Sequence, residues 1–204
     1  MTEIVEPTIR LIDDDPSVLR ALSRLLSASG HSSIPYASAE AFLADRRLEP
    51  GCAIVDLHLP GADGLELQDR LATDHGRLPL IFLTGYGDIA TGVQAMRSGA
   101  VDFLTKPVEG NALLAAVDRA LAMDRELRAS RSLNEARNRA LASLTTRENE
   151  VLALLLEGLL NKQIASRLGV VEKTVKVHRA RIMRKTGART VADLFRMMFV
   201  GTTV

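Results

Sequence analysis

The sequence contains little cysteine and few aromatic residues, and it has no long apolar run. Cys52 is the single cysteine, so an internal disulfide is excluded and a reducing compartment is favoured. Aromatic residues make up 3% of the chain and Trp is absent, which argues against a site that stacks bases or sugars on aromatic rings. The most apolar stretch, residues 151–160, is interrupted by Glu157 and Gly158 and is too short to span a membrane. Because no charged-then-apolar leader begins the chain, we expect a cytoplasmic protein without a membrane partner.

The balance of charge changes along the chain. The formal net charge is +1, but residues 1–123 hold 10 Lys and Arg against 17 Asp and Glu, whereas residues 124–204 hold 16 against 8. At 204 residues with 47% hydrophobic content, the chain is long enough for two small domains. We therefore predict an acidic first module and a basic second module with different partners, the alternative being an unevenly charged solvated surface.

The first part of the chain alternates between short apolar runs and helical patterns. We expect strands at about 8–13, 33–37, 52–56, 79–84 and 101–105, and helices at about 16–29, 38–46, 64–73, 88–98 and 110–122. Five units of this kind predict an α/β domain with a parallel sheet and right-handed crossovers. We expect this domain to cover residues 1–122. A stretch without Gly or Pro then predicts a helical or partly frayed linker over residues 123–142.

Residues 143–204 have an all-helical pattern. Helices are expected at 147–157, 162–168, 172–185 and 191–199. Thr145 and Glu148 have the spacing of a capping box, Asn161 is expected to open the second helix, and Thr190 to cap the fourth. A short turn after Gly169 joins the second and third helices, which is typical of a helix-turn-helix arrangement. The pattern therefore predicts a four-helix helix-turn-helix domain.

Polar residues stand at the ends of the expected strands. They are Asp13, Asp14 and Asp15 after the first strand, Asp56 at the end of the third, Thr84 at the end of the fourth, and Lys106 after the fifth. The carboxyl ends of parallel strands meet at one edge of the sheet, where ligands bind, so we expect these groups to converge. Asp15 precedes Pro16 and has the simpler interpretation of a helix cap. Lys106–Pro107 is a candidate cis peptide.

Such a cluster contains the groups that phosphoryl transfer to a carboxylate requires. Asp56 is the candidate nucleophile, Lys106 would neutralise charge, and the Thr84 hydroxyl would hydrogen-bond a phosphoryl oxygen. The candidate Mg²⁺ ligands are Asp13, Asp14, Asp56 and the backbone carbonyl of His58, because this hard ion prefers oxygen ligands. Without a cation, the clustered carboxylates would repel one another.

Residues 8–122 resemble the receiver domain of two-component response regulators. The resemblance rests on the segments LIDDDP at 11–16, VDLHLPGADG at 55–64, TGYGD at 84–88 and GAVDFLTKP at 99–107. It implies a flavodoxin-like (βα)5 fold with strand order 2-1-3-4-5, a phosphoryl group passed to Asp56 by a sensor histidine kinase, and Mg²⁺ at Asp13 and Asp14. Thr84 and Phe103 would form the switch pair, with Phe in place of the commoner Tyr.

The third helix of the second module is strongly basic. From Glu172 to Arg189 there are seven Lys and Arg residues and one acidic residue. Val175 and Ile182 share one side of the helix. The opposite side and its flanks carry Lys173, Lys176, Val177, Ala180, Arg181, Arg184 and Lys185. This arrangement predicts contacts with phosphates and with base edges in the major groove of double-stranded DNA, the alternative being a solvated basic face.

Residues 143–200 resemble the C-terminal helix-turn-helix of the LuxR/NarL/FixJ class, with the FixJ branch the nearest. The resemblance rests on LTTRENEVL at 144–152, GLLNKQIA at 158–165 and KTVKVHRARIMRK at 173–185. It implies that Lys176 and Val177 face bases. It also implies backbone-phosphate contacts from Asn161, Lys162, Thr174, His178 and Lys185. Val171 and Glu172 depart from the Ser that is common at the cap of this helix.

The two resemblances together predict a phosphorylation-activated transcription regulator rather than an enzyme with an external substrate. Phosphorylation is expected to reshape the face formed by residues 88–122 and to drive a homodimer there, and an unphosphorylated receiver that masks the basic helix is the alternative. RNA polymerase is a further candidate partner.

Three other classes fit less well. A haloacid-dehalogenase-type phosphatase needs a second Asp where His58 stands. A nucleotide-binding enzyme needs a Gly-rich loop where Asp13–Asp15 stand. A ligand-sensing LuxR-type regulator lacks the acidic cluster.

Overall fold

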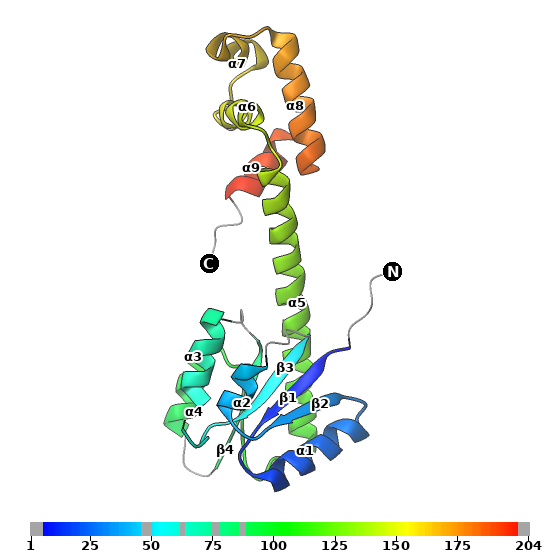
Figure 1. Cartoon of the computed structure of the whole chain (residues 1–204), viewed down its shortest axis with the longest axis vertical. Helices are drawn as coiled ribbons and strands as arrows, with labels where there is room; N and C mark the ends of the chain where they lie inside the picture. The colour runs from blue at the N-terminus through cyan, green and yellow to red at the C-terminus, as the bar shows by residue number, and fades with distance from the viewer. Residues whose placement is uncertain (1–5, 46–49, 62–63, 75–77, 86–88, 200–204) are drawn as a thin grey trace. The chain divides into compact units, whose positions relative to one another are not determined.

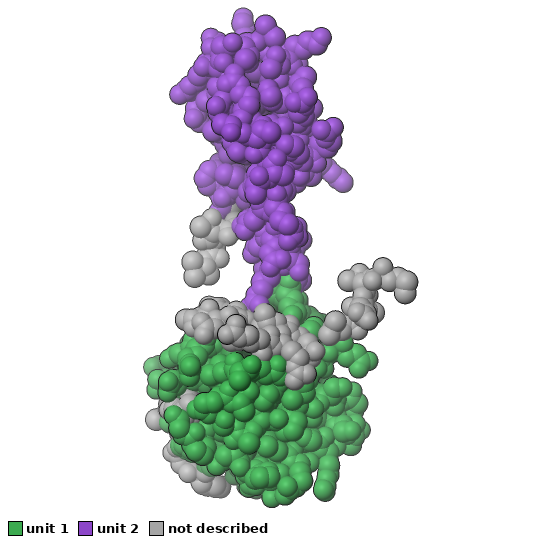
Figure 2. All heavy atoms as spheres, in the orientation of Figure 1, with its two compact units in different colours: residues 1–128 green, residues 129–204 purple. Residues whose placement is uncertain are grey.

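The computed structural model describes residues 6–45, 50–61, 64–74, 78–85 and 89–199. The chain divides into two compact units, residues 1–128 and residues 129–204 (Figure 2). Among the described residues, no helix combines the length and the apolar character needed to cross a bilayer. The predicted domain boundaries at 122 and 142 stay predictions, since the compact units meet inside a helix.

A five-stranded parallel sheet forms the centre of the first unit (Figure 1). Its strands are β1 (Thr8–Ile12), β2 (Ser32–Tyr36), β3 (Gly51–Asp56), β4 (Leu80–Thr84) and β5 (Asp102–Thr105), in the order β2-β1-β3-β4-β5. Every pair is parallel, so all five carboxyl ends lie at the same edge. The flavodoxin-like α/β prediction is confirmed.

Helices cover both faces of the sheet. On one face, α1 (Pro16–Ala28) and the start of α5 (Gly110–Ala142) bury leucine, valine and alanine side chains against β1, β3 and β4. On the other face, α2 (Ala39–Ala44), α3 (Gly64–Asp74) and α4 (Ile89–Arg97) pack on a second apolar cluster that contains Phe82. The apolar sheet is therefore buried on both sides, and polar side chains reach solvent only at its edges.

The helix α5 spans Gly110–Ala142, 33 residues, so the linker predicted over residues 123–142 is helical and continues the last helix of the first module. Its buried residues stop at Asp124, where the apolar spacing ends. The Asp124 carboxylate is 4% exposed and accepts the Gly51 N–H at 2.9 Å. Arg128 Nε donates to both oxygens of the same carboxylate, at 2.9 and 2.8 Å. This buried contact fastens α5 to the beginning of β3.

The second unit contains the four predicted helices, α6 (Thr146–Leu156), α7 (Asn161–Leu168), α8 (Glu172–Thr186) and α9 (Val191–Phe199). They enclose a core of eleven buried residues that includes Val151, Ile164 and Ile182. The caps predicted for the N-termini of α6 and α9 are present as reciprocal hydrogen bonds, between Thr145 and Glu148 and between Thr190 and Asp193.

The predicted cap of α7 is wrong by one residue. Leu160 occupies the N-cap position, and Asn161 is the first residue of the helix. The Leu160 N–H donates to Gln163 Oε1 at 2.8 Å, which supplies one half of a capping interaction without a cap side chain. The Asn161 side chain is therefore available for a contact with α8.

Candidate functional site

The strand-end residues of the first unit form one cluster. Asp13 follows β1, Asp56 ends β3, and Thr84 ends β4, and these three residues are 2%, 8% and 1% exposed. Asp14 is exposed beside them, and Lys106 follows β5 and is half-buried. Parallel pairing produces this convergence, because Asp56 lies opposite Leu83 and Thr84 lies opposite Thr105 in the register.

The ammonium of Lys106 joins two strands of the cluster. Its Nζ donates to Asp13 Oδ2 at 2.7 Å and to Asp56 Oδ2 at 2.8 Å. Burial alone would lower the pKa of Lys106, but the hydrogen bonds and charges of the two carboxylates outweigh it and raise that pKa. The Lys106 N–H donates to the Thr84 carbonyl at 2.6 Å, and Lys106–Pro107 is cis, as predicted.

The carboxylates of Asp13, Asp14 and Asp56 offer a cation one ligand oxygen each. These three oxygen atoms lie within 4.8 Å of one another. Backbone N–H groups orient the buried pair, because Asp15 N–H donates to Asp13 Oδ1 at 2.9 Å and His58 N–H donates to Asp56 Oδ1 at 3.2 Å. Oxygen ligands at this spacing fit a Mg²⁺ ion. A contribution from the His58 carbonyl stays a prediction.

Asp15 has a local role. It is the N-cap of α1, and its Oδ1 accepts the Ser17 N–H at 2.7 Å. That backbone hydrogen bond is the main reason why the pKa of Asp15 is lowered. The helix-cap interpretation of Asp15 is therefore confirmed.

The predicted switch pair consists of one buried residue, Thr84, and one half-buried residue, Phe103. The Thr84 hydroxyl donates to the Gly85 carbonyl at 3.3 Å, and the Phe103 ring packs on the cluster that contains Phe82. Their coupled movement stays a prediction. Residues 62–63 and 86–88, which belong to the quoted receiver segments, lie outside the described residues, as does the first residue of the predicted 88–122 face.

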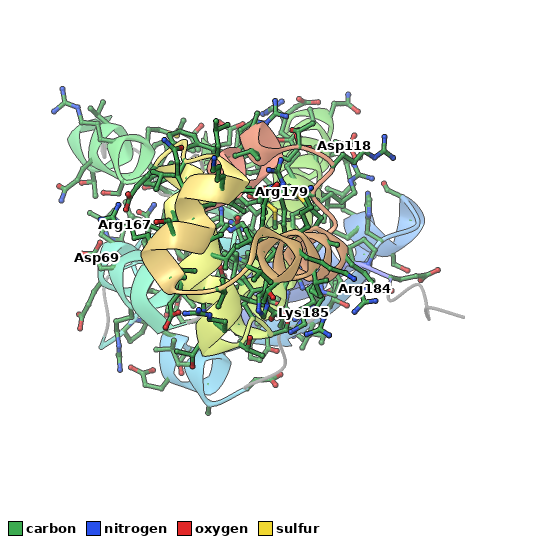
Figure 3. The ribbon with its side chains drawn as sticks, turned by 90° about the horizontal axis from the view of Figure 1, so that it is seen from above. Asp69, Asp118, Arg167, Arg179, Arg184 and Lys185 are labelled. Atoms are coloured by element: carbon green, nitrogen blue, oxygen red, sulfur yellow. The ribbon has the colours of Figure 1, made fainter. Side chains whose placement is uncertain are left out.

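The predicted DNA-binding residues of α8 differ in exposure. Val175 and Ile182 are buried, as the helical spacing predicts. Exposed residues of this helix are Lys173, Lys176, Val177, Ala180, Arg181 and Arg184, and half-buried ones are Thr174, His178 and Lys185. On α7, Lys162 is exposed and Asn161 is half-buried. Figure 3 looks along α8 and shows Arg179, Arg184 and Lys185 leaving the helix in different directions.

Lys185 has an internal role that sequence reasoning missed. Its Nζ donates to Glu148 Oε2 at 2.6 Å and to the Ser143 carbonyl at 2.8 Å. Glu148 is 2% exposed, and the hydrogen bond from Lys185 is the main reason why its pKa is lowered to about 2. Two of the three donors of this ammonium therefore serve the core of the domain, and its phosphate contact stays a prediction.

Two further contacts hold α8 in place or restrain its side chains. Arg179 donates to Asn161 Oδ1 at 3.3 Å, which joins α8 to α7. Lys176 forms an exposed ion pair with Glu172 at 3.2 Å, one turn earlier on the helix. The i,i+4 spacing of Glu172 and Lys176 indicates this pair in the sequence, whereas no local pattern indicates the contact between Arg179 and Asn161.

Both units match known families. Residues 9–118 match the response regulator receiver domain, and residues 142–198 match the bacterial regulatory proteins of the luxR family. This chain is a response regulator with a luxR-type DNA-binding domain. Its order of domains is that of a transcriptional regulator of a two-component system, as the sequence predicts.

Relatives of similar length support the assignment along the whole chain. The response regulator protein TmoT of Ectopseudomonas mendocina is 40% identical over 193 residues, which cover 94% of this chain and 88% of TmoT. The transcriptional regulatory protein FixJ of Azorhizobium caulinodans is 39% identical over 190 residues, covering 93% and 90%. These relatives are named as regulators, which agrees with the prediction of a regulator rather than a phosphatase.

Solved structures show the same fold. The response regulator StyR is 41% identical, with a TM-score of 0.84 over 95% of this chain and 98% of StyR. Full-length FixJ from B. japonicum is 34% identical, with a TM-score of 0.59 over 98% of this chain and 99% of that one. The α/β receiver followed by a helical DNA-binding domain is thus an established architecture for this chain.

Proposed function

We propose that this response regulator accepts a phosphoryl group on Asp56 from a sensor histidine kinase. The observation that supports the proposal most is the single ammonium of Lys106, which hydrogen-bonds Asp13 and Asp56 at the carboxyl edge of the sheet. In the transfer, a carboxylate oxygen of Asp56 forms a bond to the phosphorus of a phosphohistidine. The P–N bond breaks, and its electron pair remains on the histidine nitrogen.

The neighbours of Asp56 then stabilise the added charge. The Lys106 ammonium pairs with a phosphoryl oxygen, and the Thr84 hydroxyl turns from the Gly85 carbonyl to donate to another. A Mg²⁺ ion held by Asp13, Asp14, Asp56 and the His58 carbonyl would supply further positive charge at the phosphoryl group. Movement of Thr84 makes room for the Phe103 ring, so the phosphoryl group biases two conformations of one protein.

The output is DNA binding by a homodimer in the cytoplasm. We assign the dimer contact to the face formed by residues 88–122, where Val93 and Met96 of α4 are 48% and 45% exposed. Two copies of α8 then reach two half-sites of double-stranded promoter DNA. Lys176 and Val177 face the bases, Ala180 approaches a thymine methyl, and phosphates are contacted by Asn161, Lys162, Lys173, Thr174, His178, Arg181, Arg184 and Lys185. RNA polymerase is the further partner that we assign to the DNA-bound dimer.

The experiment compares the wild-type chain with Asp56→Asn after treatment with acetyl phosphate and Mg²⁺. Size-exclusion chromatography and DNA-binding titrations should show a phosphorylation-dependent dimer in the wild type and no response in Asp56→Asn. Asp69→Asn, an exposed carboxylate on α3, is the matched control and should respond as the wild type does. An equal response in Asp56→Asn would overturn the proposal, as would continuous turnover of acetyl phosphate without a stoichiometric phosphoprotein.

A further inference from the structure

The helix α4 contains a glycine in its interior where an alanine would make a more stable helix. Gly92 lies in the first half of α4 and is buried, as is Ala95 one turn later. Glycine loses more conformational freedom than any other residue when it is fixed in a helix, and only proline destabilises a helix interior more. Its backbone angles here are those of the helix, so no turn or positive φ requires it. The reason for a glycine must therefore lie in packing.

The packing neighbour is the ring of Phe103. A Cβ added to Gly92 would lie 2.7 Å from both Cε1 and Cζ of Phe103 and 2.9 Å from Cδ1. Carbon atoms in contact prefer about 3.5–4.0 Å, so the ring occupies the space that any side chain at position 92 would need. The ring can hold this position only against a glycine.

The ring position accompanies a particular set of contacts at the acidic cluster. Both carboxylate oxygens of Asp56 accept hydrogen bonds, Oδ2 from Lys106 and Oδ1 from the His58 N–H. These are the contacts of a free carboxylate. We propose that Gly92 is a positioning residue that holds Phe103 in the conformation belonging to unmodified Asp56. This inference rests on the proposed function, because it assigns Gly92 to the same switch.

A Cβ at position 92 removes the ring's place in the conformation that the structure shows. The equilibrium then shifts towards the conformation that phosphorylation favours, by the difference in free energy that the clash introduces. Because Val93 and Met96 lie on the exposed side of the same helix, a change at Gly92 also acts on the face that we assign to the dimer. Gly92→Ala should therefore respond to acetyl phosphate at a concentration about fivefold lower than the wild type requires.

The ring itself can be observed by ¹⁹F NMR of the full chain labelled with 4-fluorophenylalanine. The chain has five Phe residues, and Phe103→Leu identifies the signal of residue 103. In the wild type, acetyl phosphate with Mg²⁺ should move this signal. In Gly92→Ala, the signal should lie nearer its phosphorylated position before any acetyl phosphate is added. Gly110→Ala is the matched control, because a Cβ there meets only Leu25 at 3.6 Å, and its signal should remain where the wild type has it.

The outcomes separate the two proposals. If acetyl phosphate does not move the wild-type signal of Phe103, the proposed function is contradicted. If it moves the wild-type signal, but the signal of untreated Gly92→Ala lies where untreated wild type has it, the role of Gly92 is overturned. If Gly92→Ala lowers the thermal midpoint strongly in the wild-type background, it should lower it much less in a Phe103→Ala background, because the ring is the neighbour that clashes. An equal loss from Gly92→Ala in both backgrounds would also overturn the inference.

Discussion

Glu148 in α6 and Lys185 in α8 form an ion pair of 2.6 Å across the core of the DNA-binding domain. The carboxylate is almost fully buried, and its second role is to accept the Thr145 N–H in the capping box of α6. One carboxylate thus fixes both the beginning of α6 and the C-terminal end of α8.

Glu148→Gln should destabilise the domain at neutral pH and much less in acid. The pKa of Glu148 is lowered from 4.5 to about 2 in the folded chain, so the ionised carboxylate stabilises the fold above about pH 4.5. This contribution disappears as the pH falls towards 2, because the unfolded chain takes up the proton first. The difference in thermal midpoint between wild type and Glu148→Gln should therefore shrink between pH 7 and pH 3. Calorimetry of the full chain measures it, with Glu126→Gln, an exposed glutamate of α5, as the control.

Lys185→Ala should lower the stability of the DNA-binding domain, whereas Lys176→Ala should weaken its binding to specific DNA. Removal of Lys185 leaves a buried carboxylate without its partner, so we expect the thermal midpoint of the domain to fall by roughly 5 °C or more. Lys176 is exposed, and among the described residues Glu172 is its one ion-pair partner, so Lys176→Ala should leave the midpoint unchanged. It should weaken specific DNA binding by about 1–3 kcal/mol and relax the sequence preference. Equal losses on specific and random DNA would contradict a base contact by Lys176.

Lys106→Gln should strengthen Mg²⁺ binding while it weakens the response to phosphorylation. The ammonium neutralises part of the charge of Asp13 and Asp56, and its removal leaves more negative charge for the ion, which should raise affinity roughly tenfold. Isothermal titration with MgCl₂ at pH 7 measures this, and Lys162→Gln, a lysine of the other unit, is the control. Dimerisation on acetyl phosphate should decrease, because the phosphoryl group loses its pairing cation. Mg²⁺ affinity at or below the wild-type value would show that Lys106 does not act through charge.

Asp124→Ala should destabilise the receiver, whereas Asp124→Asn should not do so to the same extent. Alanine leaves the buried Gly51 N–H without an acceptor, which costs about 2 kcal/mol, but asparagine keeps a carbonyl oxygen in the same place. Urea unfolding of the full chain measures the difference. Equal losses in both variants would mean that the charge opposite Arg128, rather than the hydrogen bond to Gly51, fastens α5 to the sheet.

Local patterns in the sequence predict a large part of this structure. Strand-end residues such as Asp13 and Asp56 were placed together because parallel strands have a common carboxyl edge, and the exposed and buried sides of α8 follow from helical spacing. Contacts between distant segments have no such signal. Asp124 lies in the stretch predicted as a linker, and no local pattern indicates its contact with Gly51. The use of Lys185 inside the domain depends on a glutamate 37 residues away.

Gly92 shows a different limit. Its place inside a helical pattern lowers the expected stability of the helix and identifies no partner, and only the position of the Phe103 ring explains it. A glycine inside a helical pattern therefore indicates that another group packs closely there, but only the structure identifies that group.

The apolar cores of the two units have no residue in common within the described part of the chain. The clusters on the two faces of the sheet draw on residues 9–121, and the core of the helical domain draws on residues 144–194. A cavity opened in one core should then leave the unfolding temperature of the other unit unchanged. Core mutations in the receiver unit therefore place no folding constraint on the helical DNA-binding unit. The residues that determine the partner of each unit can then change independently, although α5 joins both units in one polypeptide.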